Sequence, residues 1–200
     1  MTKKYELTDV KKFFLNRTLY QIKALRSFSN VMEGDLGGWI EKEENLSHDG
    51  DCWVTGEAQI YGDARVYDNA EVHGRAEVHG RALVNDYALV RGYAEVFGNA
   101  HVYGDAQIYG NARVYGEAQV YGEALVTSDD DFCAMAGFGS AYRTTTAYRT
   151  KAGGIGISCG CFYGTLDEFR LQVEKTHGDN KFGREYQAMI QLIKVKFEVE

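Results

Sequence analysis

A six-residue alternation of apolar and polar positions dominates the middle of this chain. From Ala58 onward the order is alanine, any residue, valine or isoleucine, any residue, glycine, any residue. Alanine recurs every six residues up to Ala124, and a valine or isoleucine follows two positions after each one, beginning with Ile60. Leu46 and Cys52 hold the alanine position in two earlier, less regular copies. Self-similarity at a fixed short period is typical of a solenoid.

Each hexad predicts a short β-strand followed by a corner. Successive strand residues point to opposite faces, so the alternation places alanine and the branched residue inside. The glycine suits the corner, because glycine adopts positive φ without steric cost. Asp68 and Asp86 replace it in two copies, and aspartate tolerates this backbone region. The two aspartates lie 18 residues apart, so three hexads per turn would stack them at one corner of a triangular coil.

The absence of proline supports a coil built from backbone hydrogen bonds. Average usage of about 5% would give roughly ten prolines in a chain of this length, and this chain has none among its 200 residues. Every backbone N–H in a coil is needed for the ladder to the next coil, and proline has no N–H to give. We therefore predict a mainly β protein with a solenoid over residues 46–127.

The first 45 residues are not repetitive and are predicted to form an N-terminal cap. Tyr5–Leu7 and Leu19–Leu25 are expected as short strands, with a turn or short helix from Val10 to Leu15 between them. The first coil of a solenoid exposes an unpaired edge that invites aggregation, so covering it is the expected role of this segment. Trp39 and Trp53 are expected to plug the end of the coil.

Residues 128–200 are predicted to form a C-terminal α+β unit. Ser128–Asp131 ends the repeats and is expected to be a hinge, and residues 138–162 are expected to hold a pair of strands. Thr165 and Glu168 form a capping box, because the threonine can accept from the N3 amide while the glutamate bonds back. Apolar residues at helical spacing then predict a helix after Thr165 and a second helix from about Phe182.

The alanine–valine hexads resemble the hexapeptide-repeat, left-handed parallel β-helix family. In that family three hexads make one turn and many members are trimers, so the resemblance implies a left-handed coil and a homotrimer. A right-handed β-solenoid of the bactofilin type is the structural alternative. Gly34–Ser47, Cys161–Phe169 and Thr176–Asn180 are similar to segments of phage- and prophage-encoded hexapeptide-repeat proteins, to which YdcK-type bacterial proteins are related. This resemblance implies a small accessory protein of phage origin, with no catalytic residues to transfer.

Charge and cysteine content narrow the classes of partner. The net charge is −7, and residues 46–127 alone carry five arginines against twelve acidic residues. An acidic coil argues against binding nucleic acid.

No apolar run is long enough to span a membrane and the N-terminus lacks an apolar signal segment, so a cytoplasmic protein is expected. The four cysteines offer no disulfide framework, and Cys159 and Cys161 are too close together for a metal site, so neither metal nor cofactor is expected.

The outward positions of the coil form columns of residues 18 apart. Aromatic columns stabilise stacked strands through cross-strand pairs, and we expect this for the column that begins at Tyr61 and His79. The alternative is that one face, with Leu83 and Leu89 beside it, packs against sister chains about a three-fold axis. Basic side chains of the middle coils are candidates to line a cleft for an anionic ligand between subunits: Arg65, His73, Arg75, His79, Arg81 and Arg91.

Two groups in the C-terminal unit are further candidates for ligand binding. Arg143, Thr145 and Arg149 offer guanidinium and hydroxyl donors that suit phosphate or carboxylate, although an exposed threonine-rich strand explains them as well. His177, followed by Asp179 and then Arg184, offers a possible general base, although a turn between helices explains this group without any chemistry.

The sequence leaves three functions open. We expect a non-enzymatic binding scaffold, which in a phage setting would inhibit a host immune protein or sequester a nucleotide signal. A hexapeptide-repeat acyltransferase using acyl-CoA is the enzymatic alternative, with His101 as the candidate catalytic residue. The hexads run without an interrupting loop, and such acyltransferases often form their cleft beside one. A polymer-forming solenoid is the third possibility, against which predicted caps at both ends argue.

Overall fold

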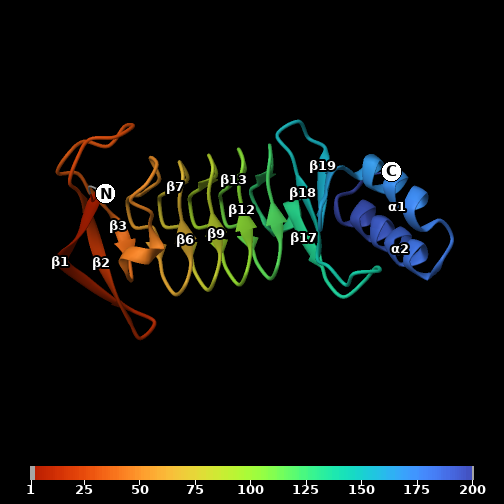
Figure 1. Ribbon diagram of the computed structural model, residues 1–200, viewed down its shortest axis with the longest axis horizontal. Helices are drawn as coiled ribbons and strands as arrows, with labels where there is room; N and C mark the ends of the chain where they lie inside the picture. The colour runs from red at the N-terminus through yellow and green to blue at the C-terminus, as the bar shows by residue number, and fades with distance from the viewer. Residues whose placement is uncertain (1–2, 200) are drawn as a thin grey trace.

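The hexads form a three-sided parallel β-solenoid with 18 residues per coil in the computed structural model, which describes residues 3–199 (Figure 1). Face 1 contains β3 (Leu36–Ile40), β5 (Gln59–Ile60), β8 (Glu77–Val78), β11 (Glu95–Val96) and β14 (Arg113–Val114). Face 2 contains β4 (Trp53–Val54), β7 (Glu71–Val72), β10 (Leu89–Val90), β13 (Gln107–Ile108) and β16 (Leu125–Val126). Face 3 contains β6 (Arg65–Val66), β9 (Leu83–Val84), β12 (His101–Val102) and β15 (Gln119–Val120). The predicted fold class is confirmed, while the handedness of the coil stays a prediction.

A ladder of backbone hydrogen bonds joins each coil to the next. The N–H of each outward residue donates to a carbonyl oxygen 17 residues further on, as from Glu77 to Ala94 at 2.9 Å and from Tyr103 to Val120 at 3.0 Å. Inside the ladder, the alanines and branched residues of the hexads are almost entirely buried. The corner glycines have positive φ, and so do Asp68 and Asp86, both at 56°. This arrangement is the one that the hexad pattern predicts.

An aromatic column runs along face 1, as predicted. The rings of Tyr61, His79, Phe97 and Tyr115 stack with successive centroid distances of 4.8, 5.1 and 5.5 Å. At the N-terminal end of the column the Phe14 ring contacts the Tyr61 ring edge-on, and at the other end the Phe132 ring contacts the Tyr115 ring edge-on. The column therefore links both caps to the coil.

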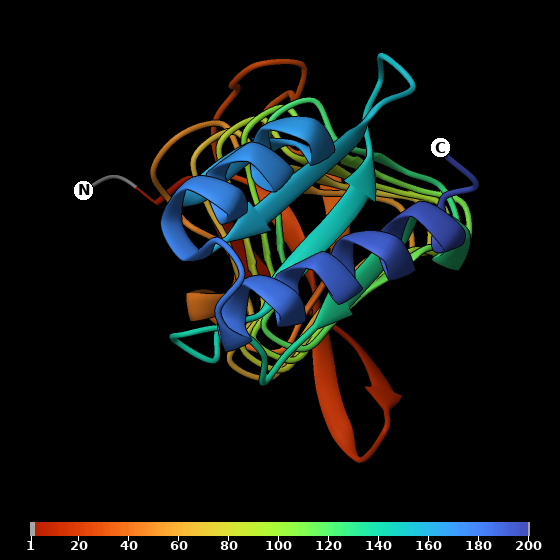
Figure 2. The same ribbon diagram turned by 90° about the vertical axis from the view of Figure 1, so that its right-hand side faces the viewer.

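An antiparallel hairpin of β1 (Tyr5–Phe14) and β2 (Arg17–Ala24) extends face 1 beyond the first coil, because β2 pairs with β3. The expectation of a turn or helix from Val10 to Leu15 was wrong, since β1 runs to Phe14 and the turn is Leu15–Asn16. Figure 2 shows the hairpin projecting to one side of the coil.

Lys4 and Tyr5 close the open end of the first coil. Lys4 Nζ donates to the carbonyl oxygens of Gly50 at 3.2 Å and Cys52 at 2.8 Å, and the Tyr5 hydroxyl donates to the carbonyl oxygens of Glu43 and Leu46. Both side chains are fully buried. They thus satisfy acceptors that no further coil is present to satisfy.

The two tryptophans were wrongly expected to plug this end. Trp39 pairs with Gln59 and Trp53 with Glu71, and both of those partners hold outward positions. Both tryptophans therefore lie on the outer wall of the coil, where loops of the N-terminal cap cover Trp53.

The C-terminal unit is a four-stranded antiparallel sheet with two helices packed on it. Its elements are a 3₁₀ turn η2 (Asp129–Asp131), β17 (Phe132–Met135), β18 (Thr145–Arg149), β19 (Ile155–Cys159), β20 (Phe162–Thr165), α1 (Leu166–His177) and α2 (Lys181–Lys196). The capping box of Thr165 and Glu168 is present at the start of α1. The segment expected as a hinge is tied to the coil, because Asp129 pairs with Arg113 at 2.6 Å. Within residues 3–199, no helix is both long enough and apolar enough to cross a bilayer.

The sheet of this unit stands on the last coil. The Gln119 N–H donates to Thr146 Oγ1 at 3.1 Å, and Ser158 Oγ donates to the Gln119 carbonyl oxygen at 2.7 Å. Thr146 and Ser158 are buried, so β18 is not the exposed strand that its threonines suggested. These hydroxyl groups take the place of the next coil's backbone.

Gly80 and Gly116 form a matched pair that tests corner stacking. Both have φ of +73° in one column, but a Cβ at Gly80 would lie 3.0 Å from backbone atoms of Gly98, whereas a Cβ at Gly116 meets nothing within 4 Å. We expect Gly116→Ala to lower the free energy of unfolding by about 1–2 kcal/mol, the usual cost of positive φ. Gly80→Ala should cost more, because the backbone of the next coil must move. Urea denaturation of both variants measures this, and equal losses would contradict the stacking explanation.

We expect acid to lower the free energy of unfolding of this protein by protonating histidines of the folded coil. Burial lowers the pKa of His48, His73, His79 and His101 below the ordinary 6.5. Below that value the unfolded chain binds more protons than the folded one, so the free energy of unfolding falls as the pH drops from 7.5 toward 5. His79→Phe keeps the aromatic column and should lose less stability over this range, as measured by urea denaturation at several pH values. An unchanged pH dependence would exclude His79 as a contributor.

Candidate functional site on face 3

A cleft of about 530 Å³ lies between face 3 and the C-terminal unit. Its lining residues are Leu83, Asn99, His101, Glu117, Gln119, Arg143, Thr144 and Gly160. One wall comes from the coil, because the first positions of β9, β12 and β15 lie in register and stack Leu83, His101 and Gln119 in one column. The C-terminal unit supplies the other wall, with Arg143 and Thr144 just before β18.

Arg143 is held over the hairpin between β19 and β20. Gly160 occupies that turn with φ of +62°, and a Cβ there would overlap the Arg143 side chain. Arg143 is exposed and forms no ion pair within residues 3–199. The cleft therefore has one guanidinium group that forms no ion pair within residues 3–199, and the Glu117 carboxylate lines the same cleft without pairing with it.

A chain of hydrogen bonds orients His101. Its Nε2 lies 2.6 Å from Asn85 Oδ1, and Asn85 Nδ2 donates to Asp86 Oδ1 at 3.1 Å. Because the amide nitrogen of Asn85 faces the aspartate, its oxygen faces the histidine, and Nε2 must then be the protonated nitrogen. The other carboxylate oxygen of Asp86 accepts from the Gly104 N–H at 2.9 Å. The aspartate that replaces a corner glycine at position 86 thus anchors this network.

His101 is consequently a neutral imidazole with one free nitrogen. Burial lowers its pKa below the ordinary value, and Asp86 opposes this effect only in part. The Tyr103 ring lies against it with a centroid distance of 4.4 Å. With Nε2 bonded to Asn85, Nδ1 carries the lone pair and has no hydrogen bond within the described residues. Such a nitrogen can accept a proton or a hydrogen bond from a ligand.

Hydrogen bonds of tyrosine hydroxyls hold the C-terminal unit against face 3. Tyr103 donates to the Tyr163 hydroxyl at 2.9 Å, and Tyr163 donates to Gln119 Oε1 at 3.3 Å. Burial and its tyrosine neighbours raise the pKa of Tyr103, so it remains a donor at neutral pH. The Tyr121 ring meets Tyr163 edge-on at 4.3 Å. These contacts fix the position of the cleft's outer wall relative to His101.

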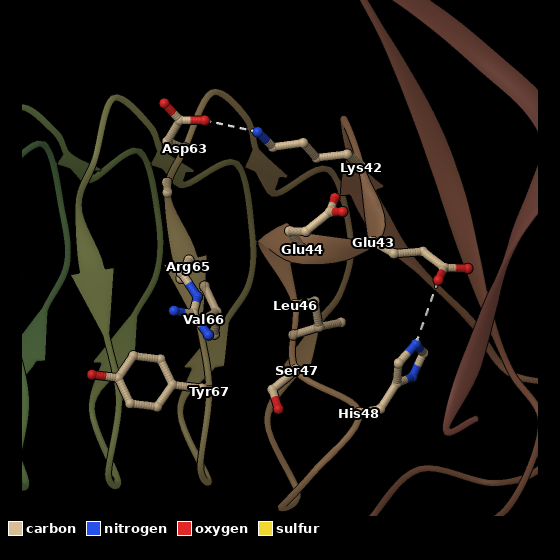
Figure 3. Close-up of a pocket in the computed structure, with 11 residues that line it drawn as sticks. Lys42, Glu43, Glu44, Leu46, Ser47, His48, Asp63, Arg65, Val66 and Tyr67 are labelled. Atoms are coloured by element: carbon tan, nitrogen blue, oxygen red, sulfur yellow. Dashed lines mark hydrogen bonds and ion pairs between the residues drawn. The ribbon is translucent and has the colours of Figure 1, made fainter. Parts of the chain in front are cut away.

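A second pocket, of about 600 Å³, lies at the N-terminal end of face 3 between β6 and the 3₁₀ turn η1 (Glu43–Asn45) (Figure 3). Its charges are largely paired, with Lys42 2.7 Å from Asp63 and Glu43 2.6 Å from Lys3. These lysines lower the pKa of both carboxyl groups. His48 Nε2 lies 3.9 Å from Glu43, and burial lowers the pKa of this histidine. The pairs brace η1 against the coil, which favours a structural role for this pocket.

The basic residues of the middle coils do not share one cleft within the chain. His73 and Arg91 lie on face 2 and His79 lies on face 1, while Arg75 and Arg81 lie at two different corners. Four of them are engaged with aromatic rings: Arg65 with Tyr67, Arg75 with Tyr93, Arg91 with Tyr109, and His79 within its column. Leu83 and Leu89 also lie on different faces, so the apolar face expected beside them is not formed.

The other candidates of the C-terminal unit serve its packing. Thr145 is fully buried and its hydroxyl donates to Cys159 Sγ at 3.2 Å, so it is not presented to a ligand. Arg149 donates to the carbonyl oxygen of Phe197, the residue that follows α2, and lies over its ring. Arg143 is the only member of that predicted group to line the cleft on face 3.

His177 ends α1 and Arg184 lies in the first turn of α2, on either side of the connection between the helices. The His177 ring stacks on Tyr186 at 5.5 Å, and Arg184 donates to the main-chain oxygen of Asp179. No hydrogen bond joins His177 to Asp179 in the described part of the chain. The interpretation of this group as a turn therefore fits its geometry better than a general base does.

Sequence reasoning singled out His101 and Arg143 separately but did not join them. It also missed Asn85 and Asp86 as the residues that orient His101. Two irregularities carried this signal: an asparagine within a column of tyrosines, and an aspartate at a corner that is otherwise glycine.

Comparison with known proteins supports the solenoid, and the matches cover only a small part of the chain. A family model described as the YdcK beta-solenoid repeat matches residues 58–74 and 106–122. A protein of Escherichia coli (strain K12) named "Uncharacterized acetyltransferase YdcK" is 35% identical over 60 residues, which is 26% of this chain and 18% of that protein. The chain is thus similar to a small part of this relative. Its origin in a phage stays a prediction.

The state of His101 can be tested by nitrogen NMR of the ring. We expect protonation at Nε2 and a pKa below 6.5, the ordinary value for histidine. Asn85→Asp should raise this pKa, because it sets a carboxylate beside Nε2. Asn99→Asp is the control, since Asn99 lines the cleft without bonding to His101, and it should change the pKa less. Equal shifts in the two variants would contradict the orienting role of Asn85.

Proposed function

We propose that this protein is a non-enzymatic binding scaffold whose cleft on face 3 takes a small polar ligand with an anionic group. The unpaired guanidinium of Arg143, which lines the same cleft as His101, is the observation that carries the proposal, because it offers a fork of donors that suits carboxylate or phosphate. The neutral His101, Gln119 and Thr144 add uncharged donors and acceptors around it. A nucleotide-like ligand fits this chemistry.

The site proposed here needs one chain, in contrast to the expected cleft between subunits. Both walls come from segments that the tyrosine contacts of Tyr103 and Tyr163 hold in place. Such a preorganised cleft loses little conformational entropy when it binds a ligand. A homotrimer and a counter-defence role against a host protein or nucleotide signal remain predictions that rest on the resemblance alone.

Acyl transfer is the second candidate, and the orientation of His101 favours it. Its Nδ1 would accept the proton of an acceptor hydroxyl or amine as that group attacks a thioester carbonyl. The resulting imidazolium would then protonate the departing thiolate, so that the proton ends on the thiol. The name of the Escherichia coli relative, which calls it an uncharacterized acetyltransferase, supports this candidate. The uninterrupted hexads argue against it, because no loop extends from the coil to hold an acyl donor.

Native mass spectrometry of the protein purified from bacteria without denaturation tests the binding proposal. We expect wild type to carry excess mass, and Arg143→Gln to lose it because the anionic group loses its partner. Arg184→Gln, which changes an arginine that does not line the cleft, should retain the excess mass. Wild type without any adduct would contradict a tightly held small ligand and direct attention to a protein partner.

An acetyl-CoA turnover assay on the same three proteins and His101→Ala separates the two candidates. The scaffold predicts no turnover above background in any of them. Turnover that His101→Ala abolishes would replace the scaffold with an acyltransferase.

A further inference from the structure

Cys52 occupies a position in the coil that the hexad pattern gives to alanine. Alanine fills this position in every copy from Ala58 to Ala124, whereas the first two copies carry Leu46 and Cys52. The Cys52 side chain is fully buried and has no disulfide partner. Packing of the coil requires only a small apolar residue here, so the sulfur atom needs a separate explanation.

The Lys4 amino group lies directly against this sulfur. Lys4 Nζ is 3.2 Å from Cys52 Sγ, and the lysine is as fully buried as the cysteine. Two hydrogens on Nζ are donated to the carbonyl oxygens of Gly50 and Cys52, at 3.2 and 2.8 Å. These bonds fix the nitrogen so that its remaining position faces the sulfur. A side chain that normally keeps its amino group in water is thus held on one reactive atom.

This contact distinguishes Cys52 from the other cysteines of the chain. Cys159 contacts the hydroxyl groups of Thr145 and Tyr186 instead of an amine. Among the described residues, no lysine forms a hydrogen bond with any of the other three cysteines. The contact between amine and thiol therefore belongs to the first coil and is not a general property of cysteines in this protein.

The environment of the pair favours an uncharged amine and an uncharged thiol. Burial lowers the pKa of the Lys4 amino group and raises the pKa of the Cys52 thiol, and each group opposes the effect on the other only in part. Arg26 and Asp51 act on Lys4 in opposite directions. An amine nitrogen that has given up its additional proton carries a lone pair, with which it can form a new bond.

We propose that Lys4 and Cys52 are a site of covalent cross-linking, in which one oxygen atom bridges Lys4 Nζ and Cys52 Sγ. Dioxygen is the oxidant, and it is small and apolar enough to reach a buried sulfur. The amine and the thiol each lose one hydrogen, one oxygen atom enters between nitrogen and sulfur, and the other oxygen atom leaves as water with both hydrogens. The nitrogen and the sulfur each give up one electron pair, and dioxygen takes up both pairs. A protonated Lys4 also releases its additional proton to water.

The bridge joins the N-terminal cap to the coil. Lys4 directly precedes β1, and Cys52 lies in the first coil 48 positions further along the chain. A cross-link between distant positions removes conformations from the unfolded chain, so the bridged protein resists denaturation better than the reduced protein. This inference is independent of the ligand proposed for face 3, because neither residue lines that cleft.

Mass spectrometry of the intact protein tests the bridge after the purified protein has been kept under air. We expect a mass gain of one oxygen atom less two hydrogen atoms, which dithiothreitol should reverse. Proteolysis of the oxidised protein should yield a pair of peptides joined between Lys4 and Cys52. The midpoint of urea denaturation should be higher for the oxidised protein than for the reduced one.

Two variants and a control locate the bridge. Cys52→Ala introduces the residue that the hexad pattern uses and leaves both carbonyl bonds of Lys4 in place, so it should fold and show no mass gain. Lys4→Met removes the amine and should also show none, with circular dichroism to confirm that it folds. Cys133→Ala is the control, because Cys133 is a partly buried cysteine without a lysine partner, and it should gain the mass as wild type does.

Three outcomes would overturn the proposal. The first is a wild-type protein whose mass does not change under air. The second is a gain of whole oxygen atoms without loss of hydrogen and without joined peptides, which would indicate ordinary oxidation of a cysteine to a sulfenic or sulfinic acid. The third is a mass gain that Cys52→Ala retains, which would assign the modification to another residue.

Discussion

The backbone ladder between successive coils is the interaction on which the rest of the structure depends. Each strand from β4 to β16 is only two residues long, and an isolated strand of that length has no stability of its own. It persists because its N–H groups donate to the coil above and its carbonyl groups accept from the coil below. Stability in such an array is a sum over neighbours, so a coil without a neighbour is the weak point.

The unusual polar residues of the chain follow from this constraint at the two ends. A fully buried lysine is rare in proteins unless it is paired, and Lys4 is buried because two carbonyl oxygens of the first coil lack a neighbour. Thr146 and Ser158 solve the same problem at the other end with neutral hydroxyl groups. Both caps thus replace part of a missing coil by side chains, while on face 1 the strand β2 continues the array by pairing with β3.

How much of this structure the sequence predicts depends on how far apart in the chain the interacting residues lie. The coil could be predicted because its contacts recur at a fixed separation, so that one hexad implies its neighbours. The site could not, because Arg143 and His101 are brought together by the way the C-terminal sheet stands on the last coil. Trp39 and Trp53 were misplaced for a related reason. Their size suggested a plug, whereas the strand register that assigns them to the outer wall depends on pairing with Gln59 and Glu71.

The 18-residue coil also limits how the length of this molecule can change during evolution. Loss or gain of a single hexad would turn the C-terminal unit by one side of the triangle, so that Arg143 would overhang a different face. Loss of a whole coil would keep it on face 3 but bring a different residue of the same column beneath it. A lineage can therefore change the length of the rod in whole coils while retaining a cleft, and it can change the chemistry of that cleft without altering a single residue in the C-terminal unit.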